Sequence, residues 1–324
     1  MLLSPLAVLY GAIVTRRIRN AKPYRSRLPV ICVGNFTAGG SGKTPLALLL
    51  AKLVAEEGRE SWFLSRGYGG TLQGPVRVDP TRHSASEVGD EPLLLARAFP
   101  AVIARDRRKG AELIETLAPE NAVIIMDDGL QNPALVKNLS IAVVDAKRGF
   151  GNGRVIPAGP LRVPLSVQAP FVQLVVLMGK QPVADRALMR TIHSLTEAPI
   201  VSAETKPSGE AARFRGQKVL AFAGIANPDR FFSTLDQLGA EIVAKRAFAD
   251  HHPFTEAEAR ELLEEAERAG GALVTTEKDL ARLSGSSGFC AELAKRSEVL
   301  AIATAIDGED LEVLRSALRR AIGG

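Results

Sequence analysis

The residues from Thr37 to Thr44, which read TAGGSGKT, join a glycine-rich turn to a lysine and a hydroxyl group. Glycine permits positive φ and close approach of the backbone to an anion, so successive amide groups can point at phosphate oxygens. Lys43 adds a positive charge, and Thr44 adds a hydroxyl ligand for Mg²⁺. The sequence therefore predicts a nucleotide phosphate site made by Thr37, Ala38, Gly39, Gly40, Ser41, Gly42, Lys43 and Thr44.

The segments that flank this loop fit the same prediction. Leu28 to Val33 is a short apolar run typical of a buried strand, and Pro45 to Val54 is rich in the Leu and Ala of a helix. Strand, loop and helix in this order place the positive end of the helix dipole at the anion. The usual pattern begins with glycine, whereas Thr37 holds that position here, and a flexible Gly/Ser turn is the alternative interpretation.

A second polar feature follows the apolar run from Ile124 to Met126, where Asp127 and Asp128 stand side by side. The carboxyl ends of parallel strands meet at one edge of a sheet, so we expect these acids beside the phosphate loop. A carboxylate there can hold Mg²⁺ or orient a water molecule. Gln131 follows closely enough to bond the nucleotide or an attacking oxygen. Without the phosphate loop, the paired acids would fit a strand that ends in an Asx turn.

Apolar runs of strand length recur along the chain, with helical stretches between several of them. This pattern predicts an α/β fold in which a parallel sheet is flanked by helices. In the first part of the chain the runs are 61–64, 101–104, 122–126, 141–144 and 172–178. A second series indicates a smaller α/β domain, with strands at 218–223, 272–275 and 299–304 and helices at 230–238 and 256–269.

A polar segment from Glu204 to Gln217 separates the two series and marks the predicted boundary. We expect an N-terminal segment over 1–27, a P-loop nucleotide-binding domain over 28–205 and the smaller domain over 206–324. A helix predicted over 307–322 begins with acidic and ends with basic residues, the order that a helix dipole favours. It can close the second domain or pack back on the first.

Composition excludes several classes of protein. Hydrophobic residues make up 46% of the 324-residue chain and charged residues 24%, as in an ordinary globular protein with a sizeable core. Two cysteines form neither a disulfide framework nor a metal cluster, which favours a reducing cytoplasm. The net charge of +5 does not suggest nucleic acid binding, because the basic excess lies beside an apolar segment with few aromatic residues for stacking.

The first thirty residues combine an apolar segment, Met1 to Val14, with six basic residues and no acidic one: Arg16, Arg17, Arg19, Lys22, Arg25 and Arg27. A secretory signal would carry its charges before the apolar part. About 14 helical residues reach roughly 21 Å, short of a hydrocarbon core of about 30 Å. We therefore expect a helix that lies in the membrane interface with its arginines on anionic head groups. The alternative is a helix packed on the protein's own core.

Taken together, these segments resemble the tetraacyldisaccharide 4′-kinases, which phosphorylate the lipid A precursor at the cytoplasmic face of the Gram-negative inner membrane. The resemblance covers most of the chain, and the order and joint occurrence of its motifs are very specific. Thr37 at the first loop position is itself what the family shows. The matching segments are VGNFTAGGSGKTP at 33–45, LSRGYGG at 64–70, VGDEP at 88–92, MDDGLQ at 126–131, GFGNGRVIPAGPLR at 149–162, FAGIANPDRF at 222–231, FADHHPF at 248–254 and TTEKD at 275–279.

The resemblance implies transfer of the γ-phosphate of ATP to the 4′-hydroxyl of a disaccharide that carries four acyl chains and a 1-phosphate. It implies that Lys43 contacts the β- and γ-phosphates, and that Thr44 with Asp127 or Asp128 holds Mg²⁺. It further implies that Asp90 and His251 act as a pair that accepts the hydroxyl proton. An ionised carboxylate beside an imidazole suits that role.

Without the family, Asp90 would be a helix cap or a salt-bridging acid, and His251 a surface loop residue beside His252. The residues of the site come from both parts of the chain, Lys43 and Asp90 from the first and His251 from the second. This predicts a cleft that closes to complete the site. Lys278 is expected to brace the second domain and receives no catalytic role.

Two further loops are expected to touch the acceptor. Arg66 and Tyr68 follow a strand and suit an anionic or sugar group. Asn152, Arg154 and Arg162 lie in a loop stiffened by Gly and Pro and suit phosphate or sugar.

One position departs from the family. An acidic residue is expected after PAGPLR in many members, and this chain has Val163 there. If that acid helps to hold Mg²⁺, another carboxylate must replace it, and Glu91 and Asp145 are the candidates.

Two other classes of function stay open at this point, and no protein partner is predicted. A P-loop ATPase or GTPase that acts as an assembly switch or metallochaperone would share Lys43, Thr44 and Asp127. It would hydrolyse nucleotide without a lipid acceptor, and it usually carries Cys/His metal clusters that this sequence lacks. A non-catalytic membrane scaffold would not need an intact Gly-Lys-Thr with paired acids.

Overall fold

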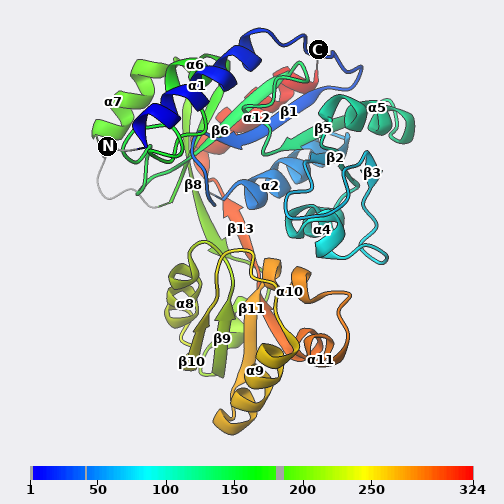
Figure 1. The fold of residues 1–324 in the computed structure, drawn as a ribbon, viewed down its shortest axis with the longest axis vertical. Helices are drawn as coiled ribbons and strands as arrows, with labels where there is room; N and C mark the ends of the chain where they lie inside the picture. Colours follow the sequence, from blue (N-terminus) through cyan, green and yellow to red (C-terminus); the bar gives the residue numbers. More distant parts are fainter. Residues whose placement is uncertain (1–2, 41, 180–185, 324) are drawn as a thin grey trace.

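The computed structural model describes residues 3–40, 42–179 and 186–323. These residues form a large sheet and a small sheet that lie end to end, with helices against both (Figure 1). Strands β8 (Ile200–Pro207) and β13 (Ile302–Ala305) lie between the two parts of the molecule in the figure. The predicted α/β fold class, with a parallel sheet flanked by helices, is confirmed.

The described residues build a nine-stranded large sheet that is parallel except at its two edges. Its middle strands are buried at every position, because helices cover both faces. From one edge to the other the strands are β13 (Ile302–Ala305), β8 (Ile200–Pro207), β7 (Leu174–Met178), β6 (Leu139–Asp145), β1 (Val30–Asn35), β5 (Ala122–Asp127), β2 (Glu60–Ser65), β4 (Ala101–Ile103) and β3 (Val76–Arg77).

Alternate residues of the middle strands point to opposite faces of the sheet and pack in two separate hydrophobic cores. One face packs against α2 (Lys43–Glu56), α4 (Asp90–Ala96) and α12 (Gly308–Ile322), with α3 (Ala85–Val88) just before α4. The other face is covered by α5 (Arg107–Leu117), α6 (Leu165–Gln168), η1 (Ala169–Phe171) and α7 (Arg186–Leu195). The first face therefore carries the helices that begin at the phosphate loop and at Asp90.

The small sheet is fully parallel, in the order β10 (Glu241–Ala247), β9 (Lys218–Ala223), β11 (Ala272–Thr276) and β12 (Ser297–Leu300). The helices on one face are η2 (Ala211–Phe214) and α8 (Pro228–Gln237), and those on the other are α9 (Glu256–Ala269) and α11 (Gly288–Arg296). Helix α10 (Glu277–Leu283) follows β11 and packs against α4 of the large sheet. The two sheets thus meet at α4 and α10.

The expectation of one strand over 299–304 was wrong, because the chain splits there between β12 of the small sheet and β13 of the large one. β13 pairs antiparallel with β8, and α12 then buries Leu314 and Leu318 in the core of the large sheet. β8 continues to Pro207, into the segment expected to be a polar boundary. An edge strand such as β13 needs only one apolar face, so its short run gives no signal of which sheet it joins.

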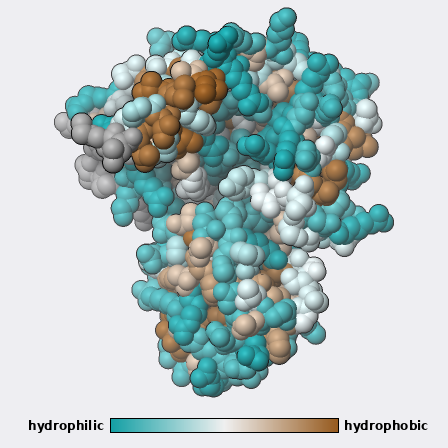
Figure 2. Space-filling view, in the orientation of Figure 1, coloured by the Kyte–Doolittle hydropathy of each residue, from teal (hydrophilic) through white to brown (hydrophobic). Residues whose placement is uncertain are grey.

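Helix α1 (Ser4–Arg19) begins in the N-terminal apolar segment and continues through the first three arginines. Its apolar side chains are largely exposed, and Figure 2 shows a hydrophobic patch over this part of the surface. The residues of that patch are Leu3, Leu6, Val8, Leu9, Tyr10 and Ile13. Among the described helices, none is both long enough and apolar enough to cross a bilayer.

Candidate active site

The phosphate loop joins the end of β1 to the start of α2, as its sequence predicts. Gly39 and Gly42 have φ of 102° and 83°, a backbone conformation that favours glycine. Lys43 and Thr44 form the first turn of α2, and their side chains are buried beside the positive end of that helix. The residues of the predicted loop thus lie at one helix N-terminus, except Ser41, which is outside the described residues.

One amide at the entrance of the loop already has a protein partner. Ala38 N donates to Pro160 O at 2.7 Å, and Thr37 forms a β-bridge with Leu161. These contacts tie the first residues of the loop to the segment before Arg162. The amides after Gly39 are therefore better placed to receive a phosphate than those of Thr37 and Ala38.

The paired acids lie next to the phosphate loop, because β5 is the neighbour of β1 and Val33 pairs with Asp127. Lys43 Nζ is 3.8 Å from Asp128 Oδ1. Arg162 binds both oxygens of Asp128, at 2.8 and 2.9 Å. Burial would raise the pKa of Asp128, but the charges of Lys43 and Arg162 outweigh it and hold the pKa below its usual value. Asp128 is therefore a charged, fixed acceptor beside the loop lysine.

Asp127 is the more unusual of the two acids. Its side chain is 1% exposed, and neither carboxylate oxygen has a hydrogen-bond partner among the described residues. Burial, with the charges of Glu91 and Asp128 nearby, raises its pKa to about 7. A buried carboxylate without a partner is costly, and a divalent cation would compensate for it. The unpartnered Asp127 carboxylate, at the end of the strand next to the phosphate loop, therefore fits a Mg²⁺ site.

The chain offers few protein ligands for this ion, and that also fits Mg²⁺. No group of three or more His, Cys, Asp or Glu side chains able to hold a metal occurs within residues 3–40, 42–179 and 186–323. Mg²⁺ commonly takes one or two carboxylates, with phosphate oxygens and water completing its six ligands. A Mg²⁺ ion held at Asp127 would therefore take its remaining ligands from phosphate and water.

We expect Asp127→Asn to stabilise the nucleotide-free protein at high pH. A carboxyl whose pKa rises from 3.8 to about 7 on folding destabilises the fold fully above pH 7, and this penalty fades as the pH falls toward 3.8. The variant should therefore melt at a higher temperature than the wild type at pH 8, with a difference that shrinks toward pH 4. Thermal unfolding across this range measures it. An equal difference at all pH values would contradict the assigned burial of charge.

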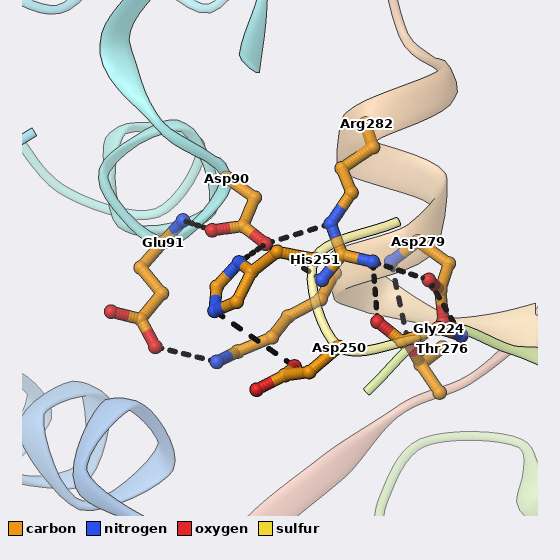
Figure 3. A network of polar contacts seen from close by, with 9 residues as sticks. Asp90, Glu91, Gly224, Asp250, His251, Thr276, Asp279 and Arg282 are labelled. Atoms are coloured by element: carbon orange, nitrogen blue, oxygen red, sulfur yellow. Dashed lines mark hydrogen bonds and ion pairs between the residues drawn. The ribbon is translucent and has the colours of Figure 1, made fainter. Parts of the chain in front are cut away.

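The second cluster joins the start of α4 to the loop after β10, where the notable pair is Asp90 and His251 (Figure 3). His251 Nδ1 is 3.0 Å from Asp90 Oδ2, although 161 positions separate the two residues. The hydrogen bond to Asp90 raises the pKa of His251. Burial opposes ionisation of Asp90, but His251 and the charges of Arg282 and Lys278 hold its pKa well below the usual range. The pair is thus an ionised carboxylate braced by an imidazole.

Backbone strain marks the same two places. Among the described residues, Asp128 and His251 are the non-glycine positions with positive φ, at 52° and 59°. Such conformations cost about 1–3 kcal/mol and are kept where surrounding contacts impose them. Strain at one residue of each cluster supports a functional role for both.

Glu91 connects the two clusters. Its carboxylate contacts Lys278 Nζ at 2.5 Å, and its charge acts on Asp127. Val163, which stands where the family often has an acid, is fully buried. Asp145 Oδ1 accepts hydrogen bonds from the amides of the turn that follows β6, at 2.9 and 2.8 Å. Of the two candidate replacements for the missing acid, Glu91 is therefore the better placed.

The expected acceptor residues separate into two places. Tyr68 is 66% exposed and meets the edge of the His251 ring with 5.7 Å between centroids. Arg66 lies on the same loop, and burial together with the charge of Arg66 lowers the pKa of Arg107 to about 10. Arg154 Nη1 instead contacts Ser4 Oγ of α1 at 3.3 Å. Tyr68 therefore borders the Asp90 cluster, Arg66 lies near Arg107 on the side of the paired acids, and Arg154 lies under the N-terminal helix.

Two residues expected in the site have structural contacts. Gln131 Nε2 donates to Asn35 O at 2.7 Å and to Gln168 Oε1 at 2.6 Å, so it braces the end of β1. Asn152 Nδ2 donates to Ala158 O at 2.9 Å within its own loop. Each side chain thus holds backbone around the site in this structure.

The comparisons with known proteins agree with this geometry. The family model described as LpxK, tetraacyldisaccharide-1-P 4′-kinase, matches residues 1–322. The chain belongs to this family. It is 54% identical over 292 residues to the tetraacyldisaccharide 4′-kinase of Methylobacterium nodulans, covering 88% of this chain and 84% of that protein. It is 49% identical to the enzyme of that name from Methylobacterium radiotolerans, covering 99% and 94%.

A solved structure gives the same result for the fold. The structure titled "apo" form LpxK from Aquifex aeolicus in complex with ATP matches with a TM-score of 0.75 and 27% identity, over 99% of this chain and 98% of that one. As a tetraacyldisaccharide 4′-kinase, the chain is a phosphotransferase of lipid A synthesis that uses ATP. The family, activity and cofactors expected from the sequence are confirmed.

The kinase also contains polar residues near the site that sequence reasoning missed. Arg282 reaches Asp90 from α10, and Arg107 is buried where the charges of Asp127 and Asp128 act on it. No motif around either arginine in the sequence indicates a role in the site. The i,i+3 spacing of Asp279 and Arg282 on a helix was the one available signal, and it predicts only a local ion pair.

Proposed function

We propose that the two clusters form one phosphoryl-transfer site, with the nucleotide on the loop from 37 to 44 and the sugar hydroxyl at Asp90. The observation that carries this proposal is the electrostatic link between the clusters. The charge of Lys278 acts on both Asp90 and Asp127, and that of Glu91 acts on Asp127. Residues 28–205 would then bind the nucleotide, and residues 206–324 would bring His251 to it.

In this proposal the loop amides after Gly39 hold the phosphates, and Lys43 neutralises charge that develops on the transferred group. Mg²⁺, when bound by Thr44 with Asp127 or Asp128, would shield the phosphate oxygens and favour the leaving group. Arg162 keeps Asp128 in place beside Lys43. The first cluster therefore supplies charge compensation.

Asp90 would act on the acceptor. The sugar oxygen forms a bond to the γ-phosphorus while the bond from that phosphorus to the β,γ-bridging oxygen breaks. The proton of the sugar hydroxyl passes to the Asp90 carboxylate, and the bond electrons stay on the attacking oxygen. His251 holds the carboxylate and stabilises its charge. Tyr68, which meets the edge of the His251 ring, borders the place where the sugar would lie.

The direct test of this function is a transfer assay with purified protein, γ-labelled ATP, Mg²⁺ and the disaccharide 1-phosphate lipid. Label should move to the lipid, and should not when the 4′-hydroxyl is replaced by hydrogen. Hydrolysis of ATP without labelled lipid would instead favour an ATPase.

The substrate is a lipid disaccharide, and the family is membrane-associated. We propose that α1 attaches this chain to the cytoplasmic face of the inner membrane. An apolar patch is exposed on α1, and three arginines occupy its last turn. A cavity of about 800 Å³ lies between α1 and the loop that carries Arg154, with Arg16 and Arg19 on its wall. Apolar surface beside basic groups suits an acyl chain and an anionic head group.

We expect the triple variant Val8→Ser, Leu9→Ser and Ile13→Ser to bind anionic liposomes about 100-fold more weakly, since each buried apolar side chain contributes roughly 1 kcal/mol. These side chains are 73%, 59% and 60% exposed, so the fold should tolerate the change. Sedimentation with liposomes measures binding.

The matched control replaces three exposed apolar residues elsewhere, Leu117, Phe289 and Val313, with serine. It should bind like the wild type. Equal partitioning of both triple variants would show that α1 does not attach the protein.

A further inference from the structure

A buried guanidinium group on α10 faces Asp90 (Figure 3). Arg282 Nε donates to Asp90 Oδ2 at 2.9 Å, and its Nη2 lies 2.8 Å from the same oxygen. The side chains of Arg282 and Asp90 are 8% and 4% exposed. Ion pairs that are this well buried bind strongly only when their geometry is fixed by further hydrogen bonds.

Arg282 has such bonds. Its Nη1 donates to Asp279 Oδ1 at 2.7 Å and to Gly224 O at 2.6 Å. Asp279 is fixed in turn, because Oδ1 accepts from Gly224 N at 3.0 Å and Oδ2 accepts from Thr276 Oγ1 at 2.6 Å. The guanidinium plane is thus held on one side by α10 and by the loop after β9, and it presents its other side to Asp90.

The loop after β10 carries His251, the partner of Asp90, and it bonds to the loop after β9. His251 N donates to Gly224 O at 3.1 Å, so this carbonyl accepts from both His251 and Arg282. A Cβ at position 224 would lie 3.1 Å from Asp279 Oδ1 and 3.3 Å from Arg282 Nη1, which leaves little room for movement. The imidazole and the guanidinium therefore approach Asp90 Oδ2 as one preformed unit of the small sheet.

We infer that Arg282 is a positioning residue of this kinase, which fixes the Asp90 carboxylate in one orientation for the proton transfer. This inference rests on the proposed function. Oδ2 is hydrogen-bonded to His251 Nδ1 and Arg282 Nε, and Arg282 Nη2 lies 2.8 Å from it, so both of its lone pairs are engaged. Among the described contacts Oδ1 accepts one bond, from Glu91 N at 2.8 Å, and it keeps a lone pair. The hydroxyl proton therefore passes to Oδ1.

Removal of Arg282 has a distinctive effect on pH dependence. The charged groups around Asp90 and His251 are Arg282, Lys278, Glu91, Asp279 and Asp250. The Arg282 charge lowers the pKa of both Asp90 and His251. Without it both pKa values rise, so the acidic limb of the pH–rate profile moves to higher pH whichever member of the pair it reports. A purely structural defect would lower the rate without moving the limb.

The experiment compares wild type, Arg282→Ala and Arg282→Lys in the lipid transfer assay from pH 5 to 9. We expect Arg282→Ala to lose about 100-fold in kcat, as for a displaced catalytic group, with the ATP affinity unchanged. Its acidic limb should move up, and added guanidinium ion should restore part of the rate. Arg282→Lys keeps the positive charge but lacks the planar guanidinium with its several donors. Its loss in kcat and the shift of its acidic limb should therefore be smaller than those of Arg282→Ala.

Arg97→Ala is the matched control. This exposed arginine also joins α4 to the end of α10, since its Nη2 donates to Ser284 Oγ at 2.6 Å, but it does not touch Asp90. It should leave the rate and the limb unchanged. If Arg282→Ala does not fold, Arg282→Lys carries the test.

The outcomes distinguish the positioning role of Arg282 from the proposed function on which it rests. Transfer by the wild type, with a limb that stays in place in the Arg282 variants, would overturn the positioning role alone. Absence of lipid labelling by the wild type would overturn the proposed function and this inference with it.

Discussion

Asp90→Asn should lower kcat by about 10³-fold while ATP binding stays within twofold of the wild type, because general-base groups contribute roughly 10²–10⁴-fold. Asparagine has nearly the same shape as aspartate, but its amide does not accept the hydroxyl proton. Asp90 contacts His251 and Arg282 and is not a predicted ligand of the phosphates. Lipid labelling gives the rate, and titration with a fluorescent ATP analogue gives the affinity.

The control for Asp90 is Asp250→Asn. Asp250 lies 3.8 Å from His251 Nε2, on the side opposite Asp90, and its side chain is 45% exposed. Its charge should be dispensable, so this variant should turn over within about threefold of the wild type, as expected for a solvated ion pair. Equal losses in the two variants would show that negative charge around His251 matters in general, and that Asp90 is no specific base.

The phosphate loop could be predicted in detail because its chemistry is local. Strand, glycine turn and helix follow each other within 27 residues. The apolar run indicates the strand, the glycines permit the turn, and Leu and Ala favour the helix. The same holds for Asp127 and Asp128, since a parallel strand that ends in acids must present them at the carboxyl edge. The structure adds that β5 is the direct neighbour of β1.

The contact between Asp90 and His251 could not be derived from local sequence. It depends on how the small sheet is placed against the large one, through α4 and α10. In the sequence analysis only the family resemblance joined these residues. Arg282 shows the same limit more strongly, because its partner lies 192 positions away and no motif names it.

The errors in the fold also arise where tertiary contacts decide. β10 and β13 are short or half-exposed edge strands, whose apolar pattern is too weak to indicate their pairing. The polar residues of β8 in the range 204–207 suggested a linker, yet pairing with β13 makes them part of the sheet. Such segments become strands because a neighbouring strand satisfies their backbone.

Lys43→Ala should abolish measurable transfer, with a loss of at least about 10³-fold, because this buried lysine at the start of α2 neutralises charge on the phosphates. Mg²⁺ and ATP should also stabilise the variant less against heat, since a ligand raises stability only as far as it binds the folded state. Label transfer and the thermal midpoint with and without Mg²⁺ and ATP give both readouts.

Lys52→Ala provides the comparison, because Lys52 lies on the same helix α2 but is exposed and away from the loop. It removes the same side chain and should keep both activity and the thermal shift. Arg162 still pairs with Asp128 in the Lys43 variant, so the acid stays compensated and the fold should persist. Retained transfer by Lys43→Ala would therefore disprove the assignment of the 37–44 loop as the phosphate site. Loss of transfer with an intact fold would show that the positive charge of Lys43 is needed for catalysis.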